Sequence, residues 1–287
     1  MRIIHSLDQM TQTARGWLTD GAVGFVPTMG YLHEGHITLV EAARQECEIT
    51  VASIFVNPIQ FDQSEEFTNY PRDPARDLQL LSNANVDIVF IPRTEDMFPP
   101  DFSTYITPAG PTAERLESLR SSGYMRGVAT GVTKLLQLVR PDRAYFGRKN
   151  AHQVVIVRKL VRDLNLDVSL RILPTVRESD GLAMSSRTHA FSPAERQAAR
   201  IIYSALLAGK TLIEQGERDS HVIEKAMADL VASEPLVRLD YAVVCHPDTF
   251  LALDELTPPA MLALAAHLGT IELIDNIVWA DNGQWLL

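Results

Sequence analysis

The fold of this chain is decided by the stretch Val26-Pro27-Thr28-Met29-Gly30-Tyr31-Leu32-His33-Glu34-Gly35-His36. The apolar run Val23 to Val26 leads into it and predicts a short buried strand, which Pro27 and Gly30 end. From His36 onward, apolar residues recur at helical spacing and predict a helix. The stretch therefore places two histidines, three residues apart, at the start of a helix that directly follows a strand.

The start of this helix has the chemistry of an anion-binding site. Its first backbone N–H groups have no partner within the helix, and the helix dipole favours a negative charge there. Gly35 lets a ligand approach the backbone closely. The imidazoles of His33 and His36 can donate hydrogen bonds to a phosphate and stabilise charge on a phosphoryl group. Surface histidines are an equally good reading of an isolated pair, whereas zinc is disfavoured because no third His or Cys lies nearby.

Composition and charge exclude several classes of protein. The 287 residues suit one large or two modest domains, and a net charge of −10 without a long basic run argues against nucleic acid as a partner. Cys47 and Cys245 lie far apart in sequence, which fits a reducing compartment. The first residues lack the apolar core of a signal peptide, and no segment has the length and apolarity of a membrane span. We expect a cytoplasmic protein without nucleic-acid or membrane partners.

The first part of the chain alternates between strand-like and helix-like segments. Strand–helix–strand units favour a parallel sheet, so the predicted fold class is α/β, a Rossmann-like doubly wound parallel sheet. Residues 98–124 are rich in Pro, Gly and Ser and predict an irregular excursion. Further strands are predicted at 49–56, 86–91, 144–146 and 168–173, and helices at 126–139 and 154–164.

The order of elements changes after residue 176. Ser192-Pro193-Ala194-Glu195 has the N-cap, the first-turn proline and the glutamate of a capping box, and we expect the helix it begins to run to about Glu214. We predict a Rossmann-like domain over residues 1–176 and a smaller α+β domain over residues 177–287 that covers the first as a lid. The second domain is expected to hold a helix at 220–232 and strands at 239–244, 261–266 and 271–278.

Three groups of polar residues stand where strands end or helices begin. Gln60 follows the second strand and can hold a polar small molecule, although a plain turn would also explain it. Lys149 lies at a helix start after Gly147, where it can meet a phosphate, although an ordinary surface lysine is the simpler reading. Ser185-Ser186-Arg187 combines two hydroxyls with a guanidinium and suits a triphosphate, unless it is a solvated loop.

Four strings, in this order along the chain, resemble those of the pantothenate synthetase (pantoate–β-alanine ligase) family of the H-x-G-H nucleotidylyltransferase superfamily. They are P-T-M-G-x-L-H-x-G-H, F-V-N-P-x-Q-F, the F-G-x-K segment with Gln153, and D-G-L-A-x-S-S-R. The resemblance implies an ATP-dependent ligase that joins pantoate to β-alanine through an acyl-adenylate, with ATP as substrate, Mg²⁺ as cofactor and a homodimeric assembly.

The resemblance also implies roles for individual residues, carried onto matching positions. The implied catalytic residues are His33, His36, Lys149, Ser185, Ser186 and Arg187. The implied ATP-binding residues are Pro27, Thr28, Met29, Gly30, His33, His36, Gly147, Lys149, Asn150, Val176, Met184, Ser185, Ser186 and Arg187. Met29, Gln60 and Gln153 would bind the acid, and Asp77 would belong to the magnesium site.

Four residues depart from the family pattern close to the predicted site. They are Tyr124 in place of a histidine, Arg148 in place of a glutamate, Asn150 in place of an aspartate and His152 in place of a glutamine. These changes motivate a second hypothesis, a divergent ligase that adenylates a different acid or uses a different amine. A nucleotide-binding protein without activity is a third hypothesis, and a tRNA synthetase is disfavoured because the chain is short and acidic.

Overall fold

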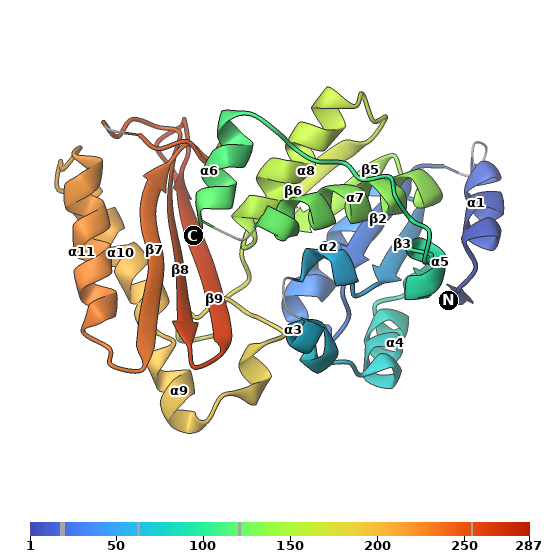
Figure 1. Cartoon of the computed structure of the whole chain (residues 1–287), viewed down its shortest axis with the longest axis horizontal. Coiled ribbons are helices and arrows are strands. Elements are labelled where there is room, and N and C mark those ends of the chain that lie inside the picture. Colours follow the sequence, from blue (N-terminus) through green and yellow to red (C-terminus); the bar gives the residue numbers. More distant parts are fainter. Residues whose placement is uncertain (18–20, 62–63, 120–121, 254) are drawn as a thin grey trace. The chain divides into compact units, whose positions relative to one another are not determined.

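The computed structural model describes residues 1–17, 21–61, 64–119, 122–253 and 255–287. The chain forms two compact units, each built from separate segments (Figure 1). The first unit comprises Met1–Ala109, Arg120–Gly147 and Ile156–Leu173, and the second comprises Gly110–Leu119, Arg148–Val155 and Pro174–Leu287. The proposed division into domains at residue 176 stays a prediction.

The first unit contains a six-stranded sheet in which every strand pair is parallel, with the order β1-β4-β3-β2-β5-β6. This confirms the predicted α/β fold class. The buried β-branched and aromatic residues of the central strands explain why these segments extend rather than coil. The strands are β1 (Arg2–Ile4), β2 (Val23–Thr28), β3 (Ile49–Ile54), β4 (Ile88–Phe90), β5 (Arg143–Gly147) and β6 (Ser169–Leu173).

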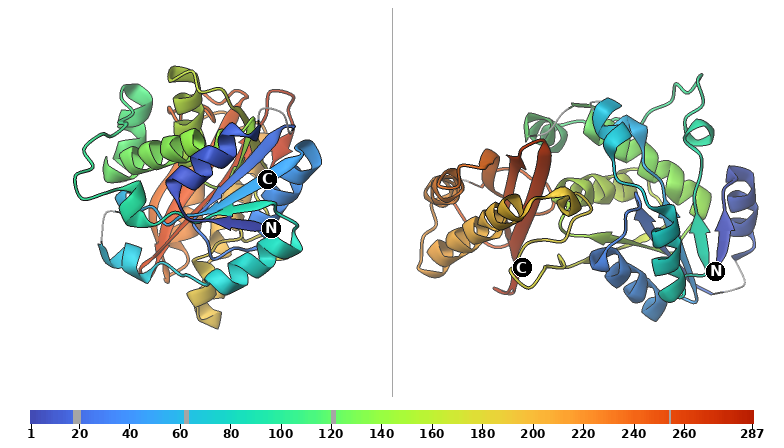
Figure 2. Two further views of the ribbon diagram at one scale, coloured as in Figure 1. Left: turned by 90° about the vertical axis from the view of Figure 1, so that its right-hand side faces the viewer. Right: turned by 90° about the horizontal axis from the view of Figure 1, so that it is seen from below.

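Helices connect the parallel strands of this sheet (Figure 2). One apolar cluster joins Leu39, Val40 and Ala43 of α2 and Leu81 of α4 to Val26, Ala52 and Val89 of the strands. Because this apolar face of α2 is buried, the direction of the helix after the histidine stretch is fixed. The helices are α1 (Leu7–Arg15), α2 (Glu34–Glu46), α3 (Ser64–Asn69), α4 (Pro74–Asn83), α5 (Thr94–Met97), α7 (Ser122–Val139) and α8 (Ala151–Asp163), with a 3-10 turn η2 at Pro58–Gln60.

The strand order reverses between β2 and β5. The chain builds β2, β3 and β4 in one direction and then returns to place β5 on the other side of β2. Open parallel sheets bind ligands at the carboxyl ends of strands beside such a switch point. Of the predicted ATP-binding residues, Pro27 and Thr28 end β2, Met29 and Gly30 follow it, and Gly147 ends β5, so the topology favours a nucleotide site at this edge.

The second unit is built around an antiparallel sheet with the order β10-β9-β8-β7. Apolar residues of α10 and α11, among them Ile202, Leu206 and Met227, pack with Leu262 and Leu264 of β8 to form its core. Figure 1 shows the two helices lying along one face of these strands. The elements are α6 (Pro111–Leu119), α9 (Pro193–Ala198), α10 (Ile201–Glu214), α11 (Ser220–Ala232), β7 (Val237–Cys245), β8 (Ala260–Leu268), β9 (Ile271–Trp279) and β10 (Trp285–Leu286).

The structure corrects three details of the sequence prediction. Residues 98–124 are not irregular throughout, because α6 occupies Pro111–Leu119 and α7 already begins at Ser122, while residues 120–121 lie outside the described part. The helix expected from Ser192 to Glu214 is divided, since α9 ends at Ala198 and α10 begins at Ile201. The capping box of Ser192 and Glu195 is confirmed. Strand β1 was not predicted, because three residues carry too little periodicity.

Among the described residues, no helix combines the length and the apolarity that crossing a membrane would require.

Candidate active site

A tight turn carries the chain from β2 to the histidine stretch in the first unit. Gly30 and Tyr31 both adopt positive φ, of 81° and 48°, a conformation that costs free energy for a tyrosine. The carboxylate of Asp77 on α4 holds the turn, because its two oxygens accept the backbone N–H groups of Tyr31 and Leu32, each at 2.7 Å. Arg76 donates to the carbonyl of Leu32 at 2.8 Å. The start of α4 thus fixes the backbone directly before His33.

His33 and His36 lie against each other at the start of α2. Their ring centroids are 4.1 Å apart with an interplanar angle of 47°. The backbone N–H of His33 donates to Nδ1 of His36 at 3.3 Å. In a neutral ring the proton then lies on Nε2, which can donate to an anion. The structure therefore brings the two predicted catalytic histidines together at a helix N-terminus, where the dipole favours a phosphate.

The predicted acid-binding residues of the first unit also meet. Nε2 of Gln60 lies 2.6 Å from the Sδ of Met29. Gln60 belongs to η2, which packs directly on α7, since a Cβ at Gly127 would overlap the backbone of Ile59 and Gln60. Nδ2 of Asn57 donates to the carbonyl of Gly127 at 2.9 Å. The absence of a side chain at Gly127 allows α7 to hold Gln60 at the end of β3.

In the second unit, Lys149 is held by the chain segment that precedes the two serines. Its Nζ donates to the carbonyl oxygen of Met184 at 2.7 Å, and the N–H of Met184 donates to the carbonyl of Val176 at 3.0 Å. The hydroxyl of Ser185 accepts the N–H of Arg187 at 3.2 Å, which folds the serine segment into a turn. Four predicted site residues, Lys149, Val176, Met184 and Ser185, thus belong to one connected piece of structure.

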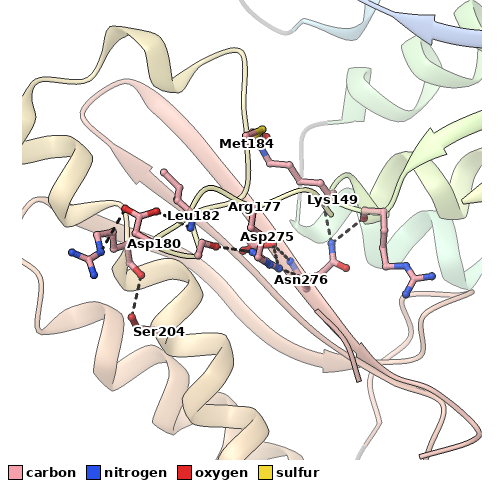
Figure 3. Close-up of polar contacts among 11 residues, drawn as sticks. Lys149, Arg177, Asp180, Leu182, Met184, Ser204, Asp275 and Asn276 are labelled. Atoms are coloured by element: carbon pink, nitrogen blue, oxygen red, sulfur yellow. Dashed lines mark hydrogen bonds and ion pairs between the residues drawn. The ribbon is translucent and has the colours of Figure 1, made fainter. Parts of the chain in front are cut away.

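Three charged or polar residues of this unit, which were not among the predicted site residues, lie near Lys149 (Figure 3). Arg177 makes a bidentate ion pair with Asp275, at 2.6 and 3.1 Å, and the two side chains are 11% and 1% exposed. Nδ2 of Asn276 donates to the carbonyls of Arg148 and Lys149, both at 3.0 Å. The sequence does contain a signal for them, because Asp275 and Asn276 interrupt an otherwise apolar strand, where unpartnered polar groups are costly.

The surroundings of Lys149 alter its ionisation. Burial in low-polarity surroundings lowers the pKa of its ammonium group to about 8, Asp275 opposes this decrease, and Arg187 and Arg177 add to it. Burial raises the pKa of Asp275, while the hydrogen bonds from Arg177 oppose that rise. A buried lysine with a lowered pKa is typical of a functional site.

The residues that depart from the family pattern have structural partners. Asn150 precedes α8, and its Oδ1 accepts the N–H of Gln153 at 3.3 Å, a helix-capping role that Asn and Asp perform about equally well. The ring of His152 is buried and stacks on Phe250, with centroids 4.5 Å apart. The carbonyl of Arg148 accepts a hydrogen bond from Asn276. Tyr124 is buried within α7.

The predicted site residues are divided between the two units. The first holds Pro27, Thr28, Met29, Gly30, His33, His36, Gln60, Asp77 and Gly147, and the second holds Lys149, Asn150, Gln153, Val176, Met184, Ser185, Ser186 and Arg187. Within the first unit His33 contacts His36 and Met29 contacts Gln60, and within the second Met184 contacts Lys149 and Val176. The roles of these residues remain predictions.

An open parallel sheet with a histidine pair at the helix that follows its central strand defines an α/β enzyme of the nucleotide-binding class. The family model of pantoate-beta-alanine ligase matches residues 2–278 of the chain. The chain belongs to this ligase family.

Individual relatives and solved structures agree with this assignment. Pantothenate synthetase of Dehalococcoides mccartyi (strain CBDB1) is 47% identical over 260 residues, covering 91% of this chain and 97% of the relative. The enzyme of Chloroflexus aurantiacus (strain ATCC 29366 / DSM 635 / J-10-fl) is 46% identical over 286 residues and 99% of both chains. The crystal structure of pantothenate synthetase from Thermus thermophilus matches with a TM-score of 0.90 at 42% identity, over 96% of this chain and 98% of that one.

A further solved structure carries ligands. Pantoate-beta-alanine ligase from Francisella tularensis, complexed with beta-gamma ATP and beta-alanine, has a TM-score of 0.79 to this chain at 29% identity and covers 97% of both chains.

Proposed function

We propose that this protein condenses pantoate with β-alanine to form pantothenate at the expense of ATP. A carboxylate oxygen of pantoate attacks the α-phosphorus of ATP, and the bond to the bridging oxygen breaks, which releases pyrophosphate and leaves pantoyl-adenylate. The neutral amine of β-alanine then attacks the acyl carbon. The amine gives up a proton, the carbon–oxygen bond to AMP breaks, and the products are the amide and AMP. Neither step requires a covalent bond to the enzyme.

Positioning and charge stabilisation carry such a reaction. In the first unit, His33 and His36 donate hydrogen bonds to phosphate oxygens, while Gln60, with Met29 beside it, holds the acid. In the second unit, Lys149, Ser185, Ser186 and Arg187 provide an ammonium, two hydroxyls and a guanidinium for the phosphates, and Gln153 adds an amide for the acid. Most of the other residues predicted to bind ATP lie at the ends of β2 and β5 or near Met184, and they would contact the nucleotide through their backbone groups.

Magnesium enters this proposal with its nucleotide, as the cation that neutralises the pyrophosphate leaving group. The carboxylate of Asp77 fits a direct ligand poorly, because the residue is 1% exposed and both oxygens accept backbone N–H groups. We also propose that the protein acts in the cytoplasm as a homodimer, which light scattering would test by giving twice the chain mass of 31.9 kDa.

The observation that carries the proposed reaction is the family match across residues 2–278, with the histidine pair and Lys149 in place. The test is release of pyrophosphate from ATP and Mg²⁺ with pantoate, with and without β-alanine, and identification of the products by mass. We expect pantothenate and AMP only when both substrates are present. Release with other acids but not with pantoate would contradict the proposed substrate, and no release with any acid would contradict the proposed ligase activity.

A divergent ligase is the second candidate, because the departures at Arg148, Asn150 and His152 lie next to Lys149 in sequence. The double variant Arg148→Glu/Asn150→Asp restores two family residues. If these departures weaken the use of pantoate, the variant should form pantothenate about tenfold faster or more, since a hydrogen bond to a charged group contributes about 1.5 kcal/mol or more. Steady-state kinetics with pantoate and ATP would measure the change.

The single variant Asn150→Asp separates the contribution of residue 150 from that of residue 148. It keeps the helix cap of α8 and changes only one charge. No gain in either variant would mean that the departures are neutral for pantoate.

A further inference from the structure

We propose that Asp275 and Asn276 of β9 are positioning residues for Lys149, with Asn276 fixing the lysine backbone and Asp275 supplying the counter-charge of its ammonium group. This inference rests on the proposed role of Lys149 in adenylation. Both residues lie about 125 positions after Lys149 in the chain and were assigned no role from the sequence.

Asn276 fixes the backbone of Lys149, from which the side chain extends. Its Nδ2 bridges the carbonyl oxygens of Arg148 and Lys149, and the residue is 1% exposed. Two donated hydrogen bonds to successive carbonyls leave the peptide between them little freedom to rotate. Since Nζ of Lys149 is simultaneously bonded to Met184, both ends of the lysine are fixed by the second unit (Figure 3). A preorganised ammonium group stabilises developing charge without reorganising during the reaction.

Asp275 determines the balance of charge around that ammonium group. The groups that act on Lys149 are Asp275 on β9, Arg177 and Glu178 on the segment after Val176, and Arg187 after the two serines. The carboxylate of Asp275 accepts two hydrogen bonds from Arg177 and one from the N–H of Asn276, at 2.8 Å. Burial raises the pKa of this carboxyl, and the three donors, above all the bidentate ion pair with Arg177, oppose that rise and favour the ionised form. Its negative charge offsets part of the repulsion that the two arginines exert on Lys149.

The charges around Lys149 make the rate of adenylation depend on pH. The ammonium form of Lys149 is the one that binds phosphate, and it predominates below its pKa of about 8. Adenylation should therefore decrease as the pH rises through about 8. Removal of the negative charge of Asp275 disfavours the ammonium form and moves this decrease to a lower pH.

The experiment is pantoate-dependent exchange of labelled pyrophosphate into ATP, measured as kcat/KM for ATP from pH 6 to 10. This assay needs no β-alanine, so the amine substrate does not contribute a titration. For Asp275→Asn we expect the midpoint of the alkaline decrease to move from about pH 8 to a lower pH, because the carboxylate that raises the pKa of Lys149 is lost. For the double variant Arg177→Gln/Asp275→Asn we expect a midpoint closer to that of the wild type, because one positive neighbour is lost together with the negative one.

Asn276→Ala tests the role proposed for Asn276. It changes no charge, so we expect an unchanged midpoint with kcat of the exchange lowered about 10- to 100-fold, as for a reacting group displaced by about 1 Å. Ile277→Val is the control for loss of stability on the same strand, because it removes one buried methyl group and no polar contact. Asp229→Asn is the control for loss of a carboxylate, since that side chain is 65% exposed on α11. Both controls should keep the wild-type rate and midpoint.

The ionisation of Lys149 can also be measured directly, without an activity assay. The chain contains lysines only at 134, 149, 159, 210 and 225, so NMR of protein labelled in the lysine side chains can follow each ammonium group, with Lys149→Ala giving the assignment. We expect the titration midpoint of Lys149 to fall in Asp275→Asn and to stay in Asn276→Ala.

The outcomes separate this inference from the proposed function. An unchanged midpoint in Asp275→Asn, or a wild-type kcat in Asn276→Ala, would overturn the inference while leaving the ligase activity intact. Should Asp275→Asn fail to fold, the double variant replaces it, and a midpoint well below that of the wild type would then contradict the charge balance. Absence of exchange in the wild type would contradict the proposed function instead, and the NMR titration would still decide whether Asp275 sets the ionisation of Lys149.

Discussion

Lys149→Ala is expected to lower the rate of acyl-adenylate formation by a factor of about 10² to 10³, the usual cost of removing one preorganised donor from a developing anion. The ammonium group lies in low-polarity surroundings that lower its pKa to about 8, where a charge acts on a phosphate more strongly than it would in water. The fold should be retained, because the substitution removes a charge that the surroundings disfavour. Pyrophosphate exchange measures the rate, and thermal unfolding confirms the fold.

The control for this variant is Lys159→Ala. Lys159 lies on α8 and pairs with Asp163 at 2.8 Å, with its side chain 31% exposed, so its removal should leave the rate unchanged. Supplying chemically made pantoyl-adenylate bypasses the first half-reaction, and the Lys149→Ala protein should then form pantothenate from β-alanine at a rate close to that of the wild type. Near-normal pyrophosphate exchange in Lys149→Ala would remove this residue from the mechanism.

The architecture was readable from the sequence where periodicity is strong. Short apolar runs predicted the interior strands of both sheets, and α11 was predicted with its observed bounds, 220–232. Short elements were harder, because the three residues of β1 acquire their stability from pairing with β4, 86 positions away. The helix α6 was hidden by the Pro-, Gly- and Ser-rich composition around it, although Ala113 and Leu116 are buried at helical spacing.

The candidate site likewise contains some residues that the sequence could predict and others that it could not. The histidine pair was predictable because its two residues are close in sequence, and the interactions between them follow from the start of one helix. Asp275 and Asn276 were not, because each acts on residues about 100 or more positions away. A lone sequence carries no record of such contacts. The sequence does show two polar residues in an apolar strand. That pattern predicts that both residues need hydrogen-bond partners, but it does not predict which residues those partners are.

The role of Asp77 can be decided because its two possible roles predict different results. Each oxygen of its carboxylate accepts one backbone N–H of the turn before His33. In Asp77→Ala these buried N–H groups lose their acceptors, and leaving a buried donor unsatisfied costs about 1–3 kcal/mol. We therefore expect the free energy of unfolding to fall by roughly 2–6 kcal/mol for the two groups together, with a loss of adenylation activity that added magnesium does not restore.

Asp77→Asn refines this test, because an amide keeps one acceptor oxygen and presents an N–H₂ group to the second backbone donor. Its loss of stability should be intermediate between those of the wild type and Asp77→Ala. Asp73→Ala is the matched control at the start of the same helix, since Asp73 is an N-cap that accepts the N–H of Arg76 at 3.1 Å. Its removal should cost about 1 kcal/mol and leave the activity unchanged.

Urea unfolding and a magnesium titration of the exchange rate distinguish the two roles of Asp77. If Asp77 stabilises the turn before His33, Asp77→Asn should have a lower urea midpoint of unfolding. Its apparent affinity for magnesium should be unchanged, because the substitution removes a partner of the turn and not of the metal. A magnesium ligand predicts the reverse, a normal midpoint with weaker apparent magnesium binding. The geometry favours the first result, since a side chain that is 1% exposed and committed to two amides in the same turn has little access to a metal brought in by the nucleotide.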